Sequence, residues 1–287
     1  MLRKGFSLKK FFFTILVLFI SASTMMAQRG PDQDYQVLLI TKSLTFQHTS
    51  VSTGVEMFKD LSEEGFFELT WTGIVASTDL AGRWFEDIDR LSRFDVVVFM
   101  NTSGNILNKI QKKVFQTYIR NGGNFVGIHA AAFTHMDDWN WYADLVGAWH
   151  NGEWGVSTAT INVENPDHPS TAHLPTKWIT TEEWYIFRQI SDSINVLLTV
   201  DEDTYGDDRM GDWHPIAWYQ EDFEGTGARS FYTALGHTDG MYSNPWFRQH
   251  ILGALWWAAT GYGLDGSLST APTVEEEKSI NLNQKQN

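Results

Sequence analysis

The chain contains no cysteine among its 287 residues. A protein with this sequence forms no disulfides, so its stability must come from a packed hydrophobic core, which a domain of this size can supply. The same absence rules out a cysteine nucleophile anywhere in the chain. It also rules out the lipid-bearing cysteine that would follow a bacterial lipoprotein signal.

Several motifs of well-known catalytic and binding sites are missing as well. There is no G-x-S-x-G motif, which argues against an ordinary serine hydrolase. Neither the H-E-x-x-H metalloprotease helix nor a G-x-G-x-x-G or Walker loop is present, so nucleotide binding has no support. The acidic stretch 201–208 lacks the Asp-x-Asp-x-Asp-Gly spacing of a calcium loop and is better interpreted as a solvated acidic loop.

Positive charge is scarce, with 21 Lys and Arg against 35 Asp and Glu and a formal net charge of -14. Residues 1–27 hold four of the bases and no acid, so the net charge without them is -14 - 4 = -18. An acidic surface disfavours nucleic acid and anionic membranes as partners. It places no such limit on a neutral small carbohydrate.

The N-terminus has the three parts of a signal peptide, namely a basic segment, an apolar run at 11–20 and a small-residue end at Ala27. The apolar run, at about 10 residues, is shorter than the roughly 20 that span a bilayer, so an uncleaved anchor is the less favoured alternative. We therefore expect a periplasmic or secreted protein without stable membrane insertion after cleavage. The expected organisation is a signal peptide at 1–27, a linker at 28–34, one domain at 35–262 and a disordered polar tail at 263–287.

Buried apolar runs alternate with helical patterns in the first half of the chain. This alternation predicts an α/β fold with a doubly wound, mostly parallel sheet. The second half is richer in β patterns, which indicates a small β-rich insertion followed by a hairpin and a last helix. Strands are expected at 35–41, 67–72, 91–101, 124–128, 157–163, 177–187, 195–201, 214–220 and 229–235, and helices at 51–64, 108–120, 139–147 and 244–259.

The segment Gly127-Ile128-His129-Ala130-Ala131 has the layout of a nucleophile elbow, with small residues two places either side of the tip. The tip is histidine, which tolerates the positive φ of such a turn better than most residues. In doubly wound sheets ligands bind at the carboxyl ends of the strands. Because His48, Asn101 and His129 each follow a predicted strand, we expect them on one rim, with His48 and Asn101 in contact with substrate.

The remaining candidates lie in the second half of the chain. His237 precedes Asp239 by two residues, a spacing that resembles a catalytic base and the acid that orients it. Histidines at one rim can act as acid and base near neutral pH. Alternatively, His48, His129 and His237 can ligate a divalent metal such as zinc, with Glu183 as a further ligand. Loop-capping or relic histidines are the third possibility.

A pair of carboxylates, Glu182 and Glu183, stands beside Trp184 and Tyr185. Carboxylates next to aromatic rings can have raised pKa values and serve as general acids, and Glu183 is the one we favour. Aromatic rings with a polar edge also suit stacking on sugars, which makes Trp141, Trp184 and Tyr185 candidate substrate contacts.

A resemblance to known proteins extends over a set of segments in one order along the chain, namely 122–131, 141–142, 145–148, 168–171, 182–185, 197–202, 214–218 and 236–238. Taken together, these segments resemble the ThuA-like family, named for trehalose utilisation. The resemblance implies a class I glutamine-amidotransferase-like, flavodoxin-like fold, with His129 in the place of the amidotransferase cysteine. It also implies a role in the breakdown of trehalose-like or 3-keto glycosides. Glu182 stands where the family has Asp, and 149–153 lacks the family's usual His-Pro pair.

These observations predict an exported protein of carbohydrate catabolism, not a glutamine amidotransferase. His129 and His237 would serve as acid and base or as metal ligands, with Glu183 and Asp239 assisting. The sequence is compatible with a sugar-directed hydrolase, lyase or isomerase. The alternative is a non-catalytic sugar-binding or accessory protein with the same pocket, and either can be a homo-oligomer.

Overall fold

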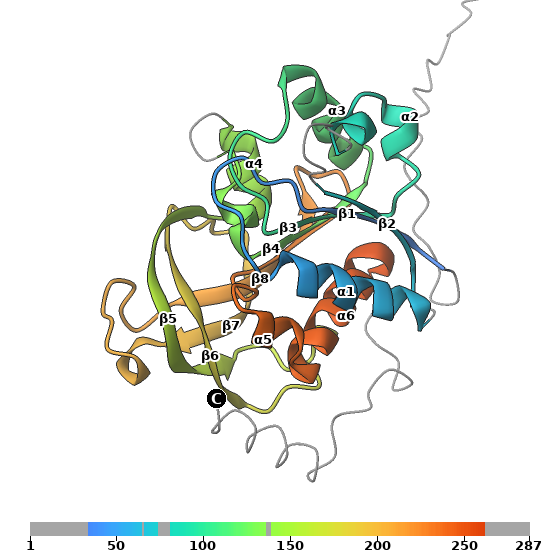
Figure 1. The fold of residues 1–287 in the computed structure, drawn as a ribbon. Helices are drawn as coiled ribbons and strands as arrows, with labels where there is room; N and C mark the ends of the chain where they lie inside the picture. The colour runs from blue at the N-terminus through green and yellow to red at the C-terminus, as the bar shows by residue number, and fades with distance from the viewer. Residues whose placement is uncertain (1–33, 65, 74–80, 136–138, 262–287) are drawn as a thin grey trace, which may run out of the picture.

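A continuous sheet runs through the computed structural model, which describes residues 34–64, 66–73, 81–135 and 139–261 (Figure 1). Within these residues it has nine strands in the order β2-β1-β3-β4-β9-β8-β7-β5-β6. The expected signal peptide, nearly all of the linker and the polar tail lie outside the described residues. None of the described helices combines the length and apolar character needed to cross a bilayer.

The first half of the sheet is parallel, as predicted. Its neighbouring strands pair in parallel register throughout. The three strands β1, β3 and β4 consist almost wholly of side chains buried on both faces, which is the pattern of a parallel sheet covered by helices on both sides. In sheet order the strands are β2 (Glu68–Thr72), β1 (Gln36–Ile40), β3 (Val96–Met100), β4 (Asn124–Ile128) and β9 (Ala228–Thr233).

Helices cover the two faces of this parallel half. One face carries α1 (Val51–Glu63), α5 (Asp239–Tyr242) and α6 (Pro245–Thr260), and Figure 1 shows these three together below the strands. The other carries the short η1 (Gly82–Phe85) with α2 (Ile88–Leu91), α3 (Lys109–Arg120) and α4 (Asn140–Val146).

Helix boundaries follow local chemistry. A capping box starts α3, because the Asn108 side chain accepts from the backbone N–H of Gln111 while the Gln111 side chain accepts from that of Asn108. Pro245 occupies the first turn of α6, where its missing N–H costs no hydrogen bond.

The second half of the sheet is antiparallel and continues the same hydrogen-bonded surface. The predicted hairpin is present as β8 (Pro215–Phe223) and β9. The predicted β-rich insertion is larger than expected, since β5 starts well before residue 157. Its register shifts between His150 and Val156, where two glycines have positive φ, so the alternation that would reveal a strand is broken there. Its strands are β5 (Trp149–Val163), β6 (Lys177–Arg188) and β7 (Asn195–Asp201), and η3 (Glu202–Thr204) follows β7.

Candidate metal centre

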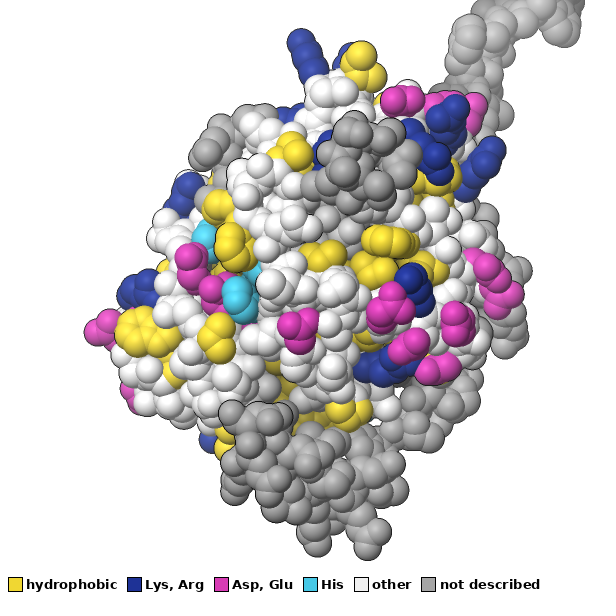
Figure 2. All heavy atoms as spheres, viewed as in Figure 1, with side chains coloured by type: hydrophobic (Ala, Val, Ile, Leu, Met, Phe, Trp, Pro, Cys, Tyr) yellow, Lys and Arg dark blue, Asp and Glu magenta, His cyan; other side chains and the backbone are white. Residues whose placement is uncertain are grey.

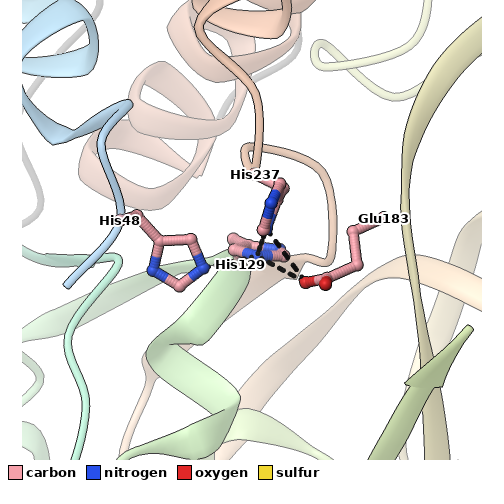
Figure 3. Close-up of side chains that lie close together, drawn as sticks. All are labelled: His48, His129, Glu183 and His237. Carbon is pink, nitrogen blue, oxygen red and sulfur yellow. Dashed lines mark hydrogen bonds and ion pairs between the residues drawn. The ribbon is translucent and has the colours of Figure 1, made fainter. Parts of the chain in front are cut away.

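Four side chains from distant parts of the chain converge at one edge of the sheet (Figure 3). His48 follows β1, His129 follows β4 and His237 follows β9, so three carboxyl ends of parallel strands contribute, while Glu183 comes from β6. Each side chain offers one ligand atom, and these atoms all lie within 4.8 Å of one another. The expected convergence of the histidines on one rim is thus present.

The turn that carries His129 has the geometry predicted from its small neighbours. β4 ends at Ile128, His129 adopts φ 51°, and the short helix η2 (His129–Phe133) follows directly. A Cβ added to Gly127 would lie 3.1 Å from the Tyr232 ring and 3.3 Å from the Ala131 methyl. A larger residue at Gly127 would therefore push the elbow away from β9, the strand beside it.

The ligand atoms are spaced as a small coordination sphere requires. The Nε2 of His129 lies 3.1 Å from the Nε2 of His48, 3.2 Å from the Nδ1 of His237 and 3.3 Å from a Glu183 carboxylate oxygen. That oxygen is 3.0 Å from the His237 Nδ1. Zinc–nitrogen bonds of roughly 2.0–2.1 Å in a tetrahedron put neighbouring ligand atoms about 3.3 Å apart. Most of the spacing of a zinc site is already present.

The hydrogen bonding of His129 leaves its Nε2 as an acceptor. Its Nδ1 lies 2.7 Å from the carbonyl oxygen of Ala234 and donates to it, which fixes the tautomer. The Nε2 lone pair then faces two further imidazole nitrogens and a carboxylate oxygen, yet one lone pair can accept only one proton from them. A cation between the four groups would satisfy all of them together.

The charge states of the four clustered side chains follow from their burial and from the carboxylate of Glu183. Burial and the neighbouring histidines lower the pKa of His48 to about 3, and burial also lowers the pKa of His129, so both rings are neutral. Burial opposes ionisation of Glu183, but the adjacent His129 and the hydrogen bond from His237 hold its pKa well below the usual range. The same carboxylate raises the pKa of His237. Neutral imidazoles and an ionised carboxylate are the forms that bind metals.

Access to the cluster is one-sided. The His129 side chain is fully buried, whereas the side chains of His237 and Glu183 are 25% and 14% exposed. Figure 2 shows histidine and acidic side chains reaching the same part of this face, with hydrophobic side chains beside them. His237 and Glu183 therefore form the exposed side of the cluster, while His48 and His129 form its floor.

Glu182, next to Glu183, holds the loop that carries His237. Its fully buried carboxylate accepts hydrogen bonds from the backbone N–H groups of Gly236 and His237, each at 3.1 Å, and of Glu183 at 2.9 Å. Burial raises its pKa to about 7 despite these bonds. Glu182, at the position where this chain departs from the motif described above, thus holds the backbone at His237 and is not one of the four clustered residues.

Two of the predicted site residues lie outside the cluster. Asp239 begins α5 and accepts a hydrogen bond from the Thr53 hydroxyl, and the carboxylate beside the His237 Nδ1 is Glu183 instead. Asn101 is fully buried, and its amide donates to the Ser50 hydroxyl, the Gly236 carbonyl and the Tyr242 hydroxyl. It ties together the loops that carry His48 and His237 and is not placed to touch substrate.

The predicted aromatic contacts also lie elsewhere. Trp184 is buried on the face of β6 opposite Glu183, where its indole N–H donates to the Ser157 carbonyl. Trp141 packs against Phe223 near the end of α3, at the amino edge of the sheet. Tyr185 does adjoin the centre, but it is nearly buried and stacks on the His129 ring at 4.3 Å, so it supports that ring from behind.

Sequence reasoning missed two aromatic neighbours of the cluster. The Phe46 ring is 56% exposed and stands edge-on to His48 at 4.7 Å. His150, in the segment that lacks the family's usual His-Pro pair, is buried with its ring 4.4 Å from that of Tyr185. Phe46 precedes His48 by two residues in the same loop, which was the available signal.

Comparison with known proteins gives one consistent result. The family model for ThuA, described as trehalose utilisation, matches residues 36–258. Among solved structures, a ThuA-like protein from Bacteroides uniformis ATCC 8492 is similar with a TM-score of 0.64 and 23% identity, over 80% of this chain and 94% of that one. One from Parabacteroides merdae ATCC 43184 has a TM-score of 0.65 and 20% identity, over 81% and 92%. At these identities the likeness of structure shows the fold alone. No match was found among proteins with curated functions.

Proposed function

This chain belongs to the ThuA family, described as trehalose utilisation, and on that premise we propose that it is an exported, metal-dependent enzyme of carbohydrate catabolism. Its substrate would be a glycoside or keto-disaccharide. The observation that supports this most strongly is the cluster of His48, His129, His237 and Glu183, whose ligand atoms lie within 4.8 Å of one another.

In this proposal the three imidazoles hold a divalent ion such as zinc. The ion supplies Lewis-acid polarisation of a sugar carbonyl or hydroxyl oxygen. Glu183, on the solvent side of the floor, is ionised at neutral pH and is placed to accept a proton from the polarised sugar. Proton removal beside a carbonyl fits a lyase or isomerase more closely than a covalent hydrolase, because His129 occupies the elbow where a nucleophile would stand.

Metal dependence is the first test. We expect the purified protein to contain about one zinc or similar ion per chain and to lose it to a chelator. Removal is expected to lower the melting temperature, because an ion that binds only the folded state stabilises it by about 4 kcal/mol at 1,000 times its dissociation constant. Activity on a 3-keto-disaccharide should vanish with the metal and return when it is restored.

The competing proposal is a non-catalytic sugar-binding protein with the same cluster. It is favoured if sugar binds but neither trehalose nor its 3-keto derivative is turned over by the metal-loaded protein. A protein that takes up no divalent ion, and whose melting temperature ignores added zinc, would contradict the metal proposal and leave the histidines as an acid–base set.

Export rests on the signal-peptide pattern of residues 1–27. The expected result is a mature protein that starts at Gln28 and is recovered from the periplasm or the medium, as read by mass spectrometry of the intact chain. Recovery of the full-length chain from the membrane fraction would instead support the uncleaved anchor.

A further inference from the structure

A pocket with a volume of about 550 Å³ adjoins the cluster. It lies between the loop after β1, the first turns of α1 and the end of β2, and His48 is one of its lining residues. His48 therefore borders both the pocket and the candidate metal centre. The volume falls in the range of roughly 300–1,000 Å³ that is usual for small-molecule sites.

The walls of the pocket combine one flat aromatic face with hydrogen-bonding groups. The Trp71 side chain is 43% exposed, and its indole N–H donates to the Thr41 hydroxyl at 3.1 Å, which fixes the ring. Around it the described part of the lining includes Gln47, Ser52 and Glu56, and the Lys59 ammonium lies 5.4 Å from the centroid of the Trp71 ring.

This composition selects for a neutral polyol. An exposed aromatic face with polar groups beside it matches a pyranose ring, which has an apolar face and a rim of hydroxyls. Glu56, the one charged side chain of the lining among the described residues, pairs with Lys59 at 2.7 Å, so the described lining offers little net charge to attract an anionic or a cationic ligand.

His48 connects this pocket with the cluster chemically. Its Nε2 faces His129, while its Nδ1 is buried and has no hydrogen-bond partner within the described part of the chain. Figure 3 shows the Nδ1 side of the ring turned away from the other three side chains. A ring that binds a metal through Nε2 carries its proton on Nδ1, so metal binding at the cluster would fix the tautomer of a ring that also lines the pocket.

We propose that this pocket binds the second sugar ring of a disaccharide whose first ring reacts at the cluster. The assignment of the reacting ring rests on the proposed function, whereas the binding of a sugar in the pocket does not. Trp71 is then the residue that makes the protein prefer a disaccharide over a monosaccharide, and His48 links the two subsites.

The test compares trehalose with methyl α-glucopyranoside by titration calorimetry on the full mature chain. We expect the wild type to bind trehalose about tenfold more tightly than the monosaccharide, a factor that corresponds to one good aromatic contact. Trp71→Ala should lose that preference and keep its zinc content. Ser52→Phe, an exposed position that fills the pocket from α1, should lose the preference with Trp71 intact.

The matched control is Trp213→Ala, which removes a tryptophan that is 50% exposed and does not line the pocket. It should leave the preference unchanged. The inference is overturned if the wild type shows no preference, if both pocket variants retain it, or if the control abolishes it equally. A wild type without zinc whose preference still depends on Trp71 would refute the proposed function while leaving the pocket assignment standing.

Discussion

The variant His129→Asn is expected to lose its bound metal and to reduce turnover by on the order of 10³-fold or more, since metal polarisation contributes several kcal/mol and each 1.36 kcal/mol is tenfold. The reason is the central place of its Nε2, which lies within 3.3 Å of a ligand atom from each of the other three residues. The loss of metal affinity should exceed the roughly 10–100-fold that follows from removing an outer partner of a ligand.

Asparagine is chosen so that the fold survives. It tolerates the positive φ of this position, and its amide can donate to the Ala234 carbonyl as the Nδ1–H of His129 does. The measurement is zinc content by elemental analysis, with turnover measured on the same samples.

His150→Asn is the matched control, because His150 is also buried and also packs on Tyr185 but is not one of the four clustered residues. This control should retain its metal. If His129→Asn bound zinc as tightly as the wild type, the four residues would not form a metal centre.

The parallel half of the fold could be predicted because strands that are buried on both faces consist of continuous apolar runs, which can be recognised in the sequence. The apolar run at 96–100, for example, has the length and composition of a buried strand. Because such strands run parallel, their carboxyl ends lie at the same edge of the sheet. The positions of His48 and His129 followed from that, since each comes after a predicted strand of the parallel half, whereas His237 was singled out by its spacing from Asp239. Family resemblance supported the same positions.

The pairing of carboxylate and histidine could not be predicted, because it depends on tertiary structure. Asp239 is two residues from His237 and had the right spacing, yet it lies in the first turn of α5, where it faces Thr53. Glu183 comes from β6, which is at the far end of the sheet from the parallel strands in the strand order. Its approach to His237 depends on how the whole sheet is shaped, and the sequence around Glu183 does not predict it.

The positions of the aromatic side chains could not be predicted, for a related reason. Composition shows that tryptophan is abundant but not which face of an element each one occupies. Trp184 alternates with Glu183 along β6 and so must point to the opposite side of the sheet. The sequence predicted Trp71 only as part of a strand. In the structure β2 is an edge strand of the sheet, so the Trp71 ring is exposed beside the pocket.

A second histidine pair, away from the candidate metal centre, predicts a steep loss of stability in mild acid. His168 and His250 are both buried against the loop at Ser170, which packs so closely on α6 that a Cβ added to Gly253 would lie 2.2 Å from the Pro169 carbonyl oxygen. The Nδ1 of His250 donates to the Ser170 carbonyl, and the Nδ1 of His168 accepts from the Ser170 N–H. The Nε2 atoms of both rings are buried without a partner among the described residues.

Burial lowers the pKa of each of these two histidines to about 3. The unfolded chain binds protons at both below a pKa of about 6.5, while the folded protein does not until near pH 3. The folded state is therefore not penalised by these two neutral rings above about pH 6.5, and it becomes progressively less stable relative to the unfolded chain as the pH falls from 6.5 towards 3. Between pH 7.5 and pH 5 each histidine should lower the free energy of unfolding by about 2 kcal/mol.

The test isolates these two groups from the other titrating residues by difference. His250→Asn keeps a donor for the Ser170 carbonyl, and His168→Asn keeps an acceptor for the Ser170 N–H, but neither variant titrates. Each variant is expected to be less stable than the wild type at pH 7.5, because it loses ring packing, and to lose about 2 kcal/mol less on acidification to pH 5. Urea unfolding at the two pH values measures this, and equal acid sensitivity in wild type and both variants would mean that these rings accept protons in the folded protein.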